Sequence, residues 1–130
     1  MKRSLTSSPV LAAIMLTLAG SAFAQEQVIK IGQTGPLSGP NAFAGKDNEN
    51  GARMAIEDLN AQNIVIAGKK IKFEIVAEDD AADPKQGTAA AQKLCDSKVA
   101  GVVGHLNSGT TIPAAKVYND CGIPHVTGAA

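Results

Sequence analysis

The stretch VAGVVGHLNSGTTIPAAKVYNDCG, Val99–Gly122, decides the fold class. It opens with an apolar run that is typical of a parallel strand covered on both faces. A helix over 112–120 follows, and Gly122 favours its end there. The apolar positions of this helix recur at the spacing of one helical face: Ala114, Val117, Tyr118 and Cys121. Between strand and helix lies GHLNSGTT (Gly104–Thr111), a junction rich in glycine and hydroxyl side chains.

The segments on either side repeat this alternation of strand and helix. Upstream, a helix runs to about Ser97 from Asp83-Pro84, because Asp accepts hydrogen bonds from free amides and Pro fits a first turn. Its apolar stripe is Gly87, Ala90, Ala91 and Leu94. Earlier in the chain we expect a strand at 28–33 and a helix at 46–61. Two strand runs on either side of AGKK (67–70) follow. Downstream, IPHVT (123–127) begins a fourth strand.

This order predicts an α/β fold with a doubly wound parallel sheet, helices on both faces and right-handed crossovers. Ligands of such sheets bind at the carboxyl ends of the strands. The loops expected at that edge are Thr34–Gly45, Asp79–Asp83, Leu106–Thr111 and the start of another at Gly128–Ala130. The sequence therefore predicts a binding site formed by these loops.

The first 24 residues predict a secretory signal peptide that is not part of this fold. Lys2 and Arg3 precede an apolar run, Val10–Ala19, and Ala22-Phe23-Ala24 has the small-x-small pattern of a cleavage site. The run is too short to cross a bilayer, which takes about 20 residues. A buried N-terminal helix is the alternative. We expect cleavage after Ala24, with residues 25–130 forming one domain outside the cytoplasm.

Charge and cysteine content exclude several classes of function. Without Lys2 and Arg3, ten basic and twelve acidic side chains remain, so a net charge of −2 gives no reason to expect nucleic acid or an anionic membrane as partner. In an oxidising compartment, Cys95 and Cys121 are expected to form a disulfide, with two buried thiols as the alternative. The two histidines, His105 and His125, lack the spacing of metal ligands.

Two interpretations of the Gly104–Thr111 junction remain open. Free amides and the helix dipole favour an anion at a helix start, where Ser108 adds a hydroxyl and Gly109 permits close approach. In the other interpretation, Thr110 or Thr111 only caps the helix. A phosphate-binding loop is not supported, because Thr110 stands where the lysine of such a loop would follow the second glycine.

Catalysis has little support in the sequence. Ser38 and Ser108 lack the flanking residues of a nucleophile elbow. His105 and His125 are interpreted as hydrogen-bonded histidines at strand ends. The acidic cluster is interpreted as a solvated loop with an N-cap, not as a cation site: Glu78, Asp79, Asp80 and Asp83. We therefore expect no enzymatic activity, no cofactor and no metal.

Three segments resemble the periplasmic leucine/isoleucine/valine-binding proteins of ABC importers: GPLSGP (35–40), DDAADPKQ (79–86) and GHLNSGTTIPA (104–114). The resemblance runs from Val28 to Ala130. It implies two α/β lobes that close on a small amino acid, and a periplasmic monomer that delivers this ligand to a membrane permease. Residues 25–130 are then an incomplete N-terminal lobe, and the second lobe is missing.

The resemblance also implies which residues bind the ligand. The family's serine, which holds the carboxylate or amine of the amino acid, corresponds to Ser108. Thr111 corresponds to a donor at the helix start, and Ala129 to a main-chain contact. An aromatic that covers the ligand aligns with Ala44, so the adjacent Phe43 takes its place. Asn107 and Gly109, which flank Ser108, complete the expected set.

The cysteine positions differ from the family pattern, and the identity of the ligand stays open. Members of this type bridge positions that are Ala82 and Asn107 here, whereas this chain offers Cys95 and Cys121 at the C-terminal ends of two helices expected to be neighbours. We predict a disulfide between them. Two alternative functions remain: the extracellular ligand-sensing domain of a receptor, and transport of an amide, urea or aromatic acid.

Overall fold

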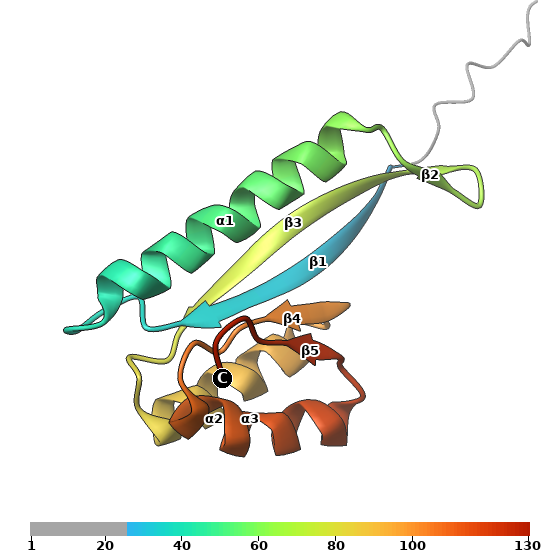
Figure 1. Ribbon diagram of the computed structural model, residues 1–130. Helices are drawn as coiled ribbons and strands as arrows, with labels where there is room; N and C mark the ends of the chain where they lie inside the picture. The colour runs from blue at the N-terminus through green and yellow to red at the C-terminus, as the bar shows by residue number, and fades with distance from the viewer. Residues whose placement is uncertain (1–25) are drawn as a thin grey trace, which may run out of the picture.

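The computed structural model describes residues 26–130, so the predicted signal peptide lies outside the described residues. Eight elements follow one another (Figure 1): β1 (Glu26–Gly35), α1 (Ala42–Ala61), β2 (Val65–Ile66), β3 (Lys69–Asp79), α2 (Pro84–Asp96), β4 (Gly101–Val103), α3 (Ser108–Cys121) and β5 (His125–Val126). Within residues 26–130, none of the helices combines the length and apolar character needed to cross a membrane.

The strands form one sheet in the order β2-β3-β1-β4-β5. β1 runs parallel to both β3 and β4, and β4 runs parallel to β5. The short edge strand β2 is antiparallel to β3, because the two form a hairpin whose turn is Ala67-Gly68, within the AGKK segment. The predicted doubly wound α/β sheet is confirmed, with this antiparallel edge added.

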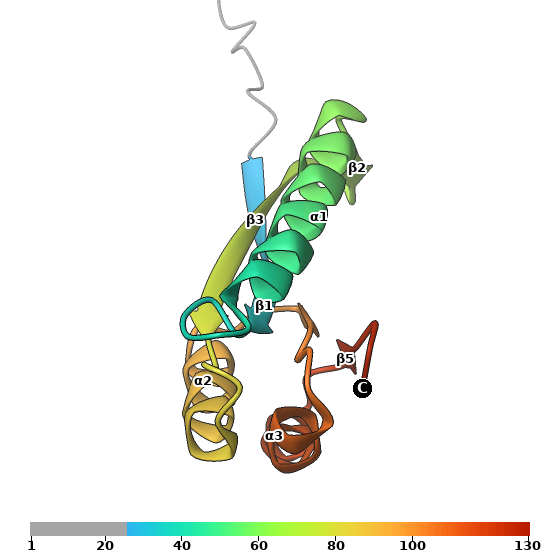
Figure 2. The same ribbon diagram turned by 60° about the vertical axis from the view of Figure 1, so that its left-hand side comes forward.

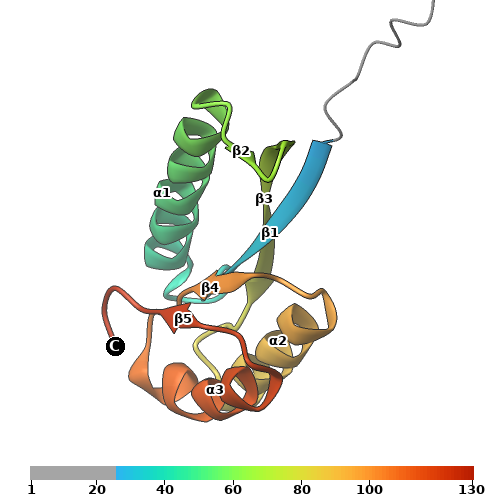
Figure 3. The same ribbon diagram turned by 90° about the vertical axis from the view of Figure 1, so that its right-hand side faces the viewer.

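Helices cover both faces of the sheet, as predicted. α1 packs on β1 and β3 from one side, while α2 and α3 pack against each other on the opposite side (Figures 2 and 3). The main core lies between the sheet and the α2–α3 pair. It consists of Ala91, Leu94, Val99, Val102, Ala114 and Tyr118. The apolar stripes predicted for the second and third helices thus face the core.

α1 departs from its predicted boundaries and stripe. It begins at Ala42 instead of near Lys46, and Ala55 is exposed although the periodicity places it on the apolar face. Gly45 is buried against Pro36, and a side chain there would collide with the Pro36 carbonyl. Glu49 is buried as well. Its carboxylate accepts hydrogen bonds from Lys46 and, with a smaller effect, from Arg53, and these bonds hold the pKa of Glu49 below its ordinary value.

The expectation that the run at 99–106 is a strand covered on both faces is wrong. Only Gly101–Val103 forms β4. Val102 points to the α2–α3 side and is buried, but Val103 points to the other side and remains 44% exposed. The reason is positional: α1 packs over β1 and β3, not over β4. A continuous apolar run indicates that both faces of a strand carry apolar side chains. It does not show that another element packs on each face.

A disulfide joins the C-terminal ends of α2 and α3, which confirms the predicted pairing. Cys95 and Cys121 are 26 residues apart in the chain, and their Cα atoms are 6.2 Å apart. This separation falls within the range that a disulfide spans without backbone movement. The alternative of two buried thiols is thereby excluded. The bridge fixes α3 to α2 at the edge of the sheet opposite the candidate site.

Candidate ligand-binding site

The carboxyl ends of the four parallel strands meet at one edge of the molecule. β1 ends at Gly35 beside Asp79 of β3, and β4 ends at Val103 beside Val126 of β5. The loops that follow these strands lead into α1, α2, α3 and the C-terminal residues. The edge predicted to hold the site is therefore formed as expected.

The predicted ligand loop is the first turn of α3, because the helix begins at Ser108 and not at Ile112. Asn107 is the N-cap, yet its side chain makes no capping hydrogen bond. Thr110 and Thr111 are not caps: their hydroxyls donate to the carbonyl of Asn107 at 2.8 and 2.9 Å, as do their amides at 3.1 and 2.9 Å. The interpretation of a threonine cap is therefore wrong.

This turn exposes hydrogen-bond donors to solvent. Ser108 and Gly109 are the first two residues of α3, so their amides have no carbonyl one turn earlier to bind. Both residues are exposed, and no atom lies near the position that a side chain would take at Gly109. The Oδ1 atom of Asn107 is buried without a partner. Together with the positive end of the helix dipole, the amides and the Ser108 hydroxyl suit a carboxylate. The Oδ1 atom of Asn107 is an acceptor and suits a donor group instead.

The other predicted site residues lie in different settings. Thr111 is buried and uses both its amide and its hydroxyl on Asn107, so here it shapes the turn that presents Ser108. Phe43 lies at the start of α1 and is 77% exposed. Ala129 is exposed after β5.

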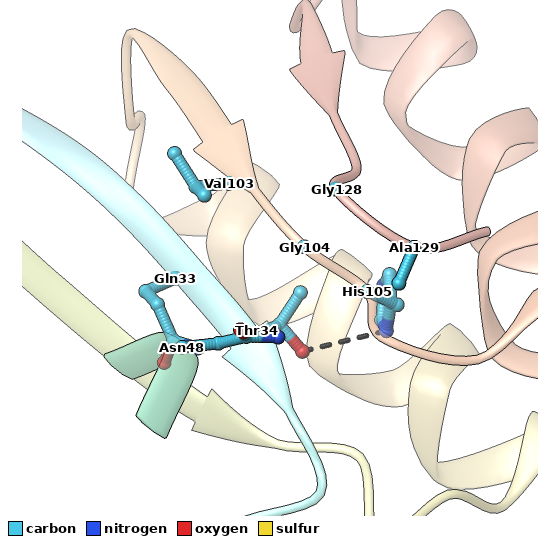
Figure 4. A pocket seen from close by; sticks show the side chains of 8 residues that line it. All are labelled: Gln33, Thr34, Asn48, Val103, Gly104, His105, Gly128 and Ala129. Carbon is cyan, nitrogen blue, oxygen red and sulfur yellow. Dashed lines mark hydrogen bonds between the residues drawn. The ribbon is translucent and has the colours of Figure 1, made fainter. Parts of the chain in front are cut away.

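A cavity of about 170 Å³ opens beside these loops, between β1, α1 and the C-terminal residues (Figure 4). Its lining consists of Gln33, Thr34, Asn48, Val103, Gly104, His105, Gly128 and Ala129. Of the predicted site residues, Ala129 belongs to this lining, whereas Ser108, Thr111, Phe43, Asn107 and Gly109 do not.

Sequence reasoning missed two polar residues of this cavity, Gln33 and Asn48. Gln33 is only 1% exposed, and its Oε1 atom has no hydrogen-bond partner. A glutamine at the end of an otherwise apolar strand was the available signal, because such a side chain needs a partner when buried. Asn48 sits on α1 among other polar residues and gives no such signal.

A buried hydrogen-bond network centred on His105 joins the carboxyl ends of the strands to α3. The Nδ1 atom of His105 lies 2.6 Å from Oδ2 of Asp80 and 3.4 Å from the Thr34 hydroxyl, and Nε2 lies 3.2 Å from the Tyr118 hydroxyl. The pKa of Tyr118 is raised by burial and, second, by the charge of Asp80. Tyr118 therefore keeps its proton. The Nδ1 proton is assigned to the bond with Asp80, because a carboxylate can only accept.

The network settles two interpretations of the sequence. The His105 side chain is fully buried and hydrogen-bonded at a strand end, as expected. The expectation that the acidic cluster is solvated is wrong for Asp80, which is fully buried and also accepts from the Ala82 amide at 2.9 Å. Asp83 is the predicted N-cap and accepts from the Gln86 amide at 2.9 Å. Within residues 26–130, no cluster of three metal-binding side chains occurs.

Asp79 makes the fold sensitive to acid. Burial raises the pKa of Asp79, but hydrogen bonds from Ser38 and from the amides of Ala81 and Leu37 outweigh burial and hold the pKa below the ordinary value of 3.8. Because the pKa of Asp79 is lower in the folded than in the unfolded protein, its ionised carboxylate stabilises the fold above pH 3.8. This stabilisation is lost as the pH falls through the pKa of Asp79 in the folded protein. Asp79→Asn is therefore expected to be less stable than the wild type at pH 7, with the gap shrinking below pH 3.8. Urea unfolding between pH 7 and pH 3 measures this gap, and a constant gap contradicts the assignment.

Comparison with known proteins identifies the family. The family model described as periplasmic binding protein matches residues 28–130, which is nearly all of the described chain. The chain belongs to the periplasmic binding protein family. The match includes both the carboxyl-edge loops and the first turn of α3.

Curated members of this periplasmic binding protein family match closely in sequence. The Leu/Ile/Val-binding protein of Escherichia coli (strain K12) is 41% identical over 115 residues, which cover 88% of this chain and 30% of that protein. The Leu/Ile/Val-binding protein homolog 1 of Brucella abortus (strain 2308) is 40% identical over 130 residues, 100% of this chain and 33% of the homolog. The chain thus spans about a third of the length of these relatives.

Solved structures of periplasmic binding proteins share the fold. The branched-chain amino acid transporter substrate-binding protein LivJ from Streptococcus pneumoniae, in complex with isoleucine, superposes with a TM-score of 0.71 at 32% identity. The match covers 80% of this chain and 29% of LivJ. A solute-binding protein of an ABC transporter from Rhodopseudomonas palustris, in complex with 3,4-dihydroxybenzoic acid, gives a TM-score of 0.66 at 30% identity, over 79% of this chain and 27% of that one.

Proposed function

We propose that this lobe forms one half of a periplasmic site that captures a branched-chain or related small amino acid and delivers it, chemically unchanged, to the permease of an ABC transporter. The observation that carries the proposal is the first turn of α3, where the exposed Ser108 adjoins two free amides. These groups are suited to the carboxylate that every free amino acid carries.

The remaining predicted residues complete the half-site around this carboxylate. Ala129 offers main-chain groups from the loop after β5, and Gly109 leaves the approach to the amides open. The exposed aromatic ring of Phe43 covers the ligand from the start of α1. Partners for the ammonium group and the side chain come from a second lobe. In this proposal the protein acts as a monomer after cleavage of the signal peptide at Ala24.

An aromatic acid is the second candidate ligand. The related protein from Rhodopseudomonas palustris was solved in complex with 3,4-dihydroxybenzoic acid. An aromatic acid carries the same carboxylate but no α-ammonium, so the first turn of α3 can serve both ligand classes. Calorimetric titration with leucine, isoleucine, valine and 3,4-dihydroxybenzoate separates the two, and we expect the three amino acids to bind more tightly.

Ser108→Ala tests the role of the first turn of α3. Loss of a hydrogen bond to a charged group typically costs about 1–3 kcal/mol, so the dissociation constant for leucine is expected to rise about 5- to 150-fold. The measurement is calorimetric titration of the protein expressed from its complete gene. Ser97→Ala, at the C-cap of α2 on the opposite edge, is the control and should leave affinity unchanged. Equal affinities in both variants remove Ser108 from the site.

A further inference from the structure

A single hydroxyl group links the two loops that carry the predicted ligand-binding residues. The Oγ1 atom of Thr127, directly after β5, donates to the carbonyl of His105 at 2.6 Å. The same oxygen accepts from the amide of Ala130 at 3.2 Å and lies 3.4 Å from the amide of Ala129. Thr127 therefore ties the segment before Ser108 to the segment that contains Ala129.

His105 is itself held by three other elements, so the link through Thr127 ends on a fixed point. The imidazole contacts Asp80 after β3, Thr34 at the end of β1 and Tyr118 on α3. Its side chain is fully buried. Because these contacts come from three different segments of the chain, the residue whose carbonyl accepts from Thr127 is held in place by its side chain.

The backbone before His105 is also closely packed against β1. Gly104 has a φ of +117°, and a side chain there would collide with the carbonyl of Thr34. Its amide donates to the carbonyl of Val126 at 2.9 Å, immediately before Thr127. The strand ends of β1, β4 and β5 are thus joined to one another, and the Thr127 hydroxyl is the side-chain partner of the amides of Ala129 and Ala130.

We propose that Thr127 is a positioning residue that fixes the loop of Ala129 against the segment leading to Ser108, so that both halves of this lobe's ligand site are spaced correctly before the ligand arrives. This inference rests on the proposed function and deepens it. A site whose loops are ordered in advance binds more tightly, because less conformational freedom is lost on binding.

The test compares Thr127→Val with Thr127→Ser in the protein expressed from its complete gene. Valine keeps the shape of threonine and removes the hydroxyl, whereas serine keeps the hydroxyl. We expect Thr127→Val to raise the dissociation constant for leucine about tenfold, the usual order for one lost hydrogen bond, and Thr127→Ser to stay within about twofold. Leu94→Ala, in the core under α2, is the control for general destabilisation: it should lower the melting temperature and keep the affinity.

Amide hydrogen exchange, followed by NMR without ligand, gives a second readout. In Thr127→Val the amide of Ala130 should exchange about tenfold faster than in the wild type, and in Thr127→Ser at the wild-type rate. Unchanged exchange in Thr127→Val overturns the inference, as does an equal affinity for leucine in the two variants. If the wild type binds neither leucine, isoleucine nor valine, the proposed function fails, and the exchange rates alone then decide whether Thr127 fixes the loop.

Discussion

Asp80→Ala is expected to lower the free energy of unfolding by about 3–5 kcal/mol. The carboxylate of Asp80 is fully buried and accepts from the imidazole of His105 at 2.6 Å and from the amide of Ala82 at 2.9 Å. Its removal leaves both donors without an acceptor. Since a domain of this size is stable by only about 5–15 kcal/mol, this loss is a large part of the total.

Two variants separate the buried pair from ordinary loop effects. Asp83→Ala removes an N-cap three residues away and should cost only about 1 kcal/mol. Asp80→Asn keeps an oxygen for the Ala82 amide but has none for His105, so it should fall between the two. Urea unfolding at pH 7 measures all three. A loss for Asp80→Ala no greater than that for Asp83→Ala contradicts the assigned network.

Reduction of the disulfide between Cys95 and Cys121 is expected to destabilise the lobe by about 3.5 kcal/mol in the chain-entropy estimate for a closed loop of this length. The bridge closes a loop of 26 residues that contains β4 and most of α3. Without it the unfolded chain gains conformational freedom, while the folded α2–α3 contact remains. The site at the opposite edge should keep its affinity for leucine as long as the lobe stays folded.

Urea unfolding with and without reductant measures this effect on one and the same sequence. The double variant Cys95→Ala/Cys121→Ala is the matched control and should lose stability to a similar degree, with no further loss on reduction. Thiol counting on the unfolded, unreduced protein checks the bond itself. Two free thiols in that experiment contradict the disulfide.

Local periodicity was enough to predict the helices and strands in which buried residues recur at a regular spacing. In α2, Gly87, Ala90, Ala91 and Leu94 recur on one face, and all four are buried. The alternation of such helices with apolar strands then determines the sheet, since parallel crossovers are right-handed. The disulfide follows from the same order, because α2 and α3 are consecutive crossovers on one face and end at the same edge.

Features that depend on distant partners could not be predicted. Asp80 and His105 are 25 residues apart, and neither position carries a local sign of the other. The sequence predicts a start of α3 at Ile112, four residues after the observed start at Ser108, because Ser, Gly and Thr have low helix propensity. The structure shows why the helix still forms there: the carbonyl of Asn107 accepts from the amides and hydroxyls of Thr110 and Thr111.

The position of a bound amino acid tests the central claim most directly. A crystal structure of the protein from its complete gene, grown with leucine, provides it. We expect the leucine carboxylate within about 3 Å of the Ser108 hydroxyl and of an amide in the first turn of α3. Leucine bound away from this turn, or found converted to another compound, contradicts the account.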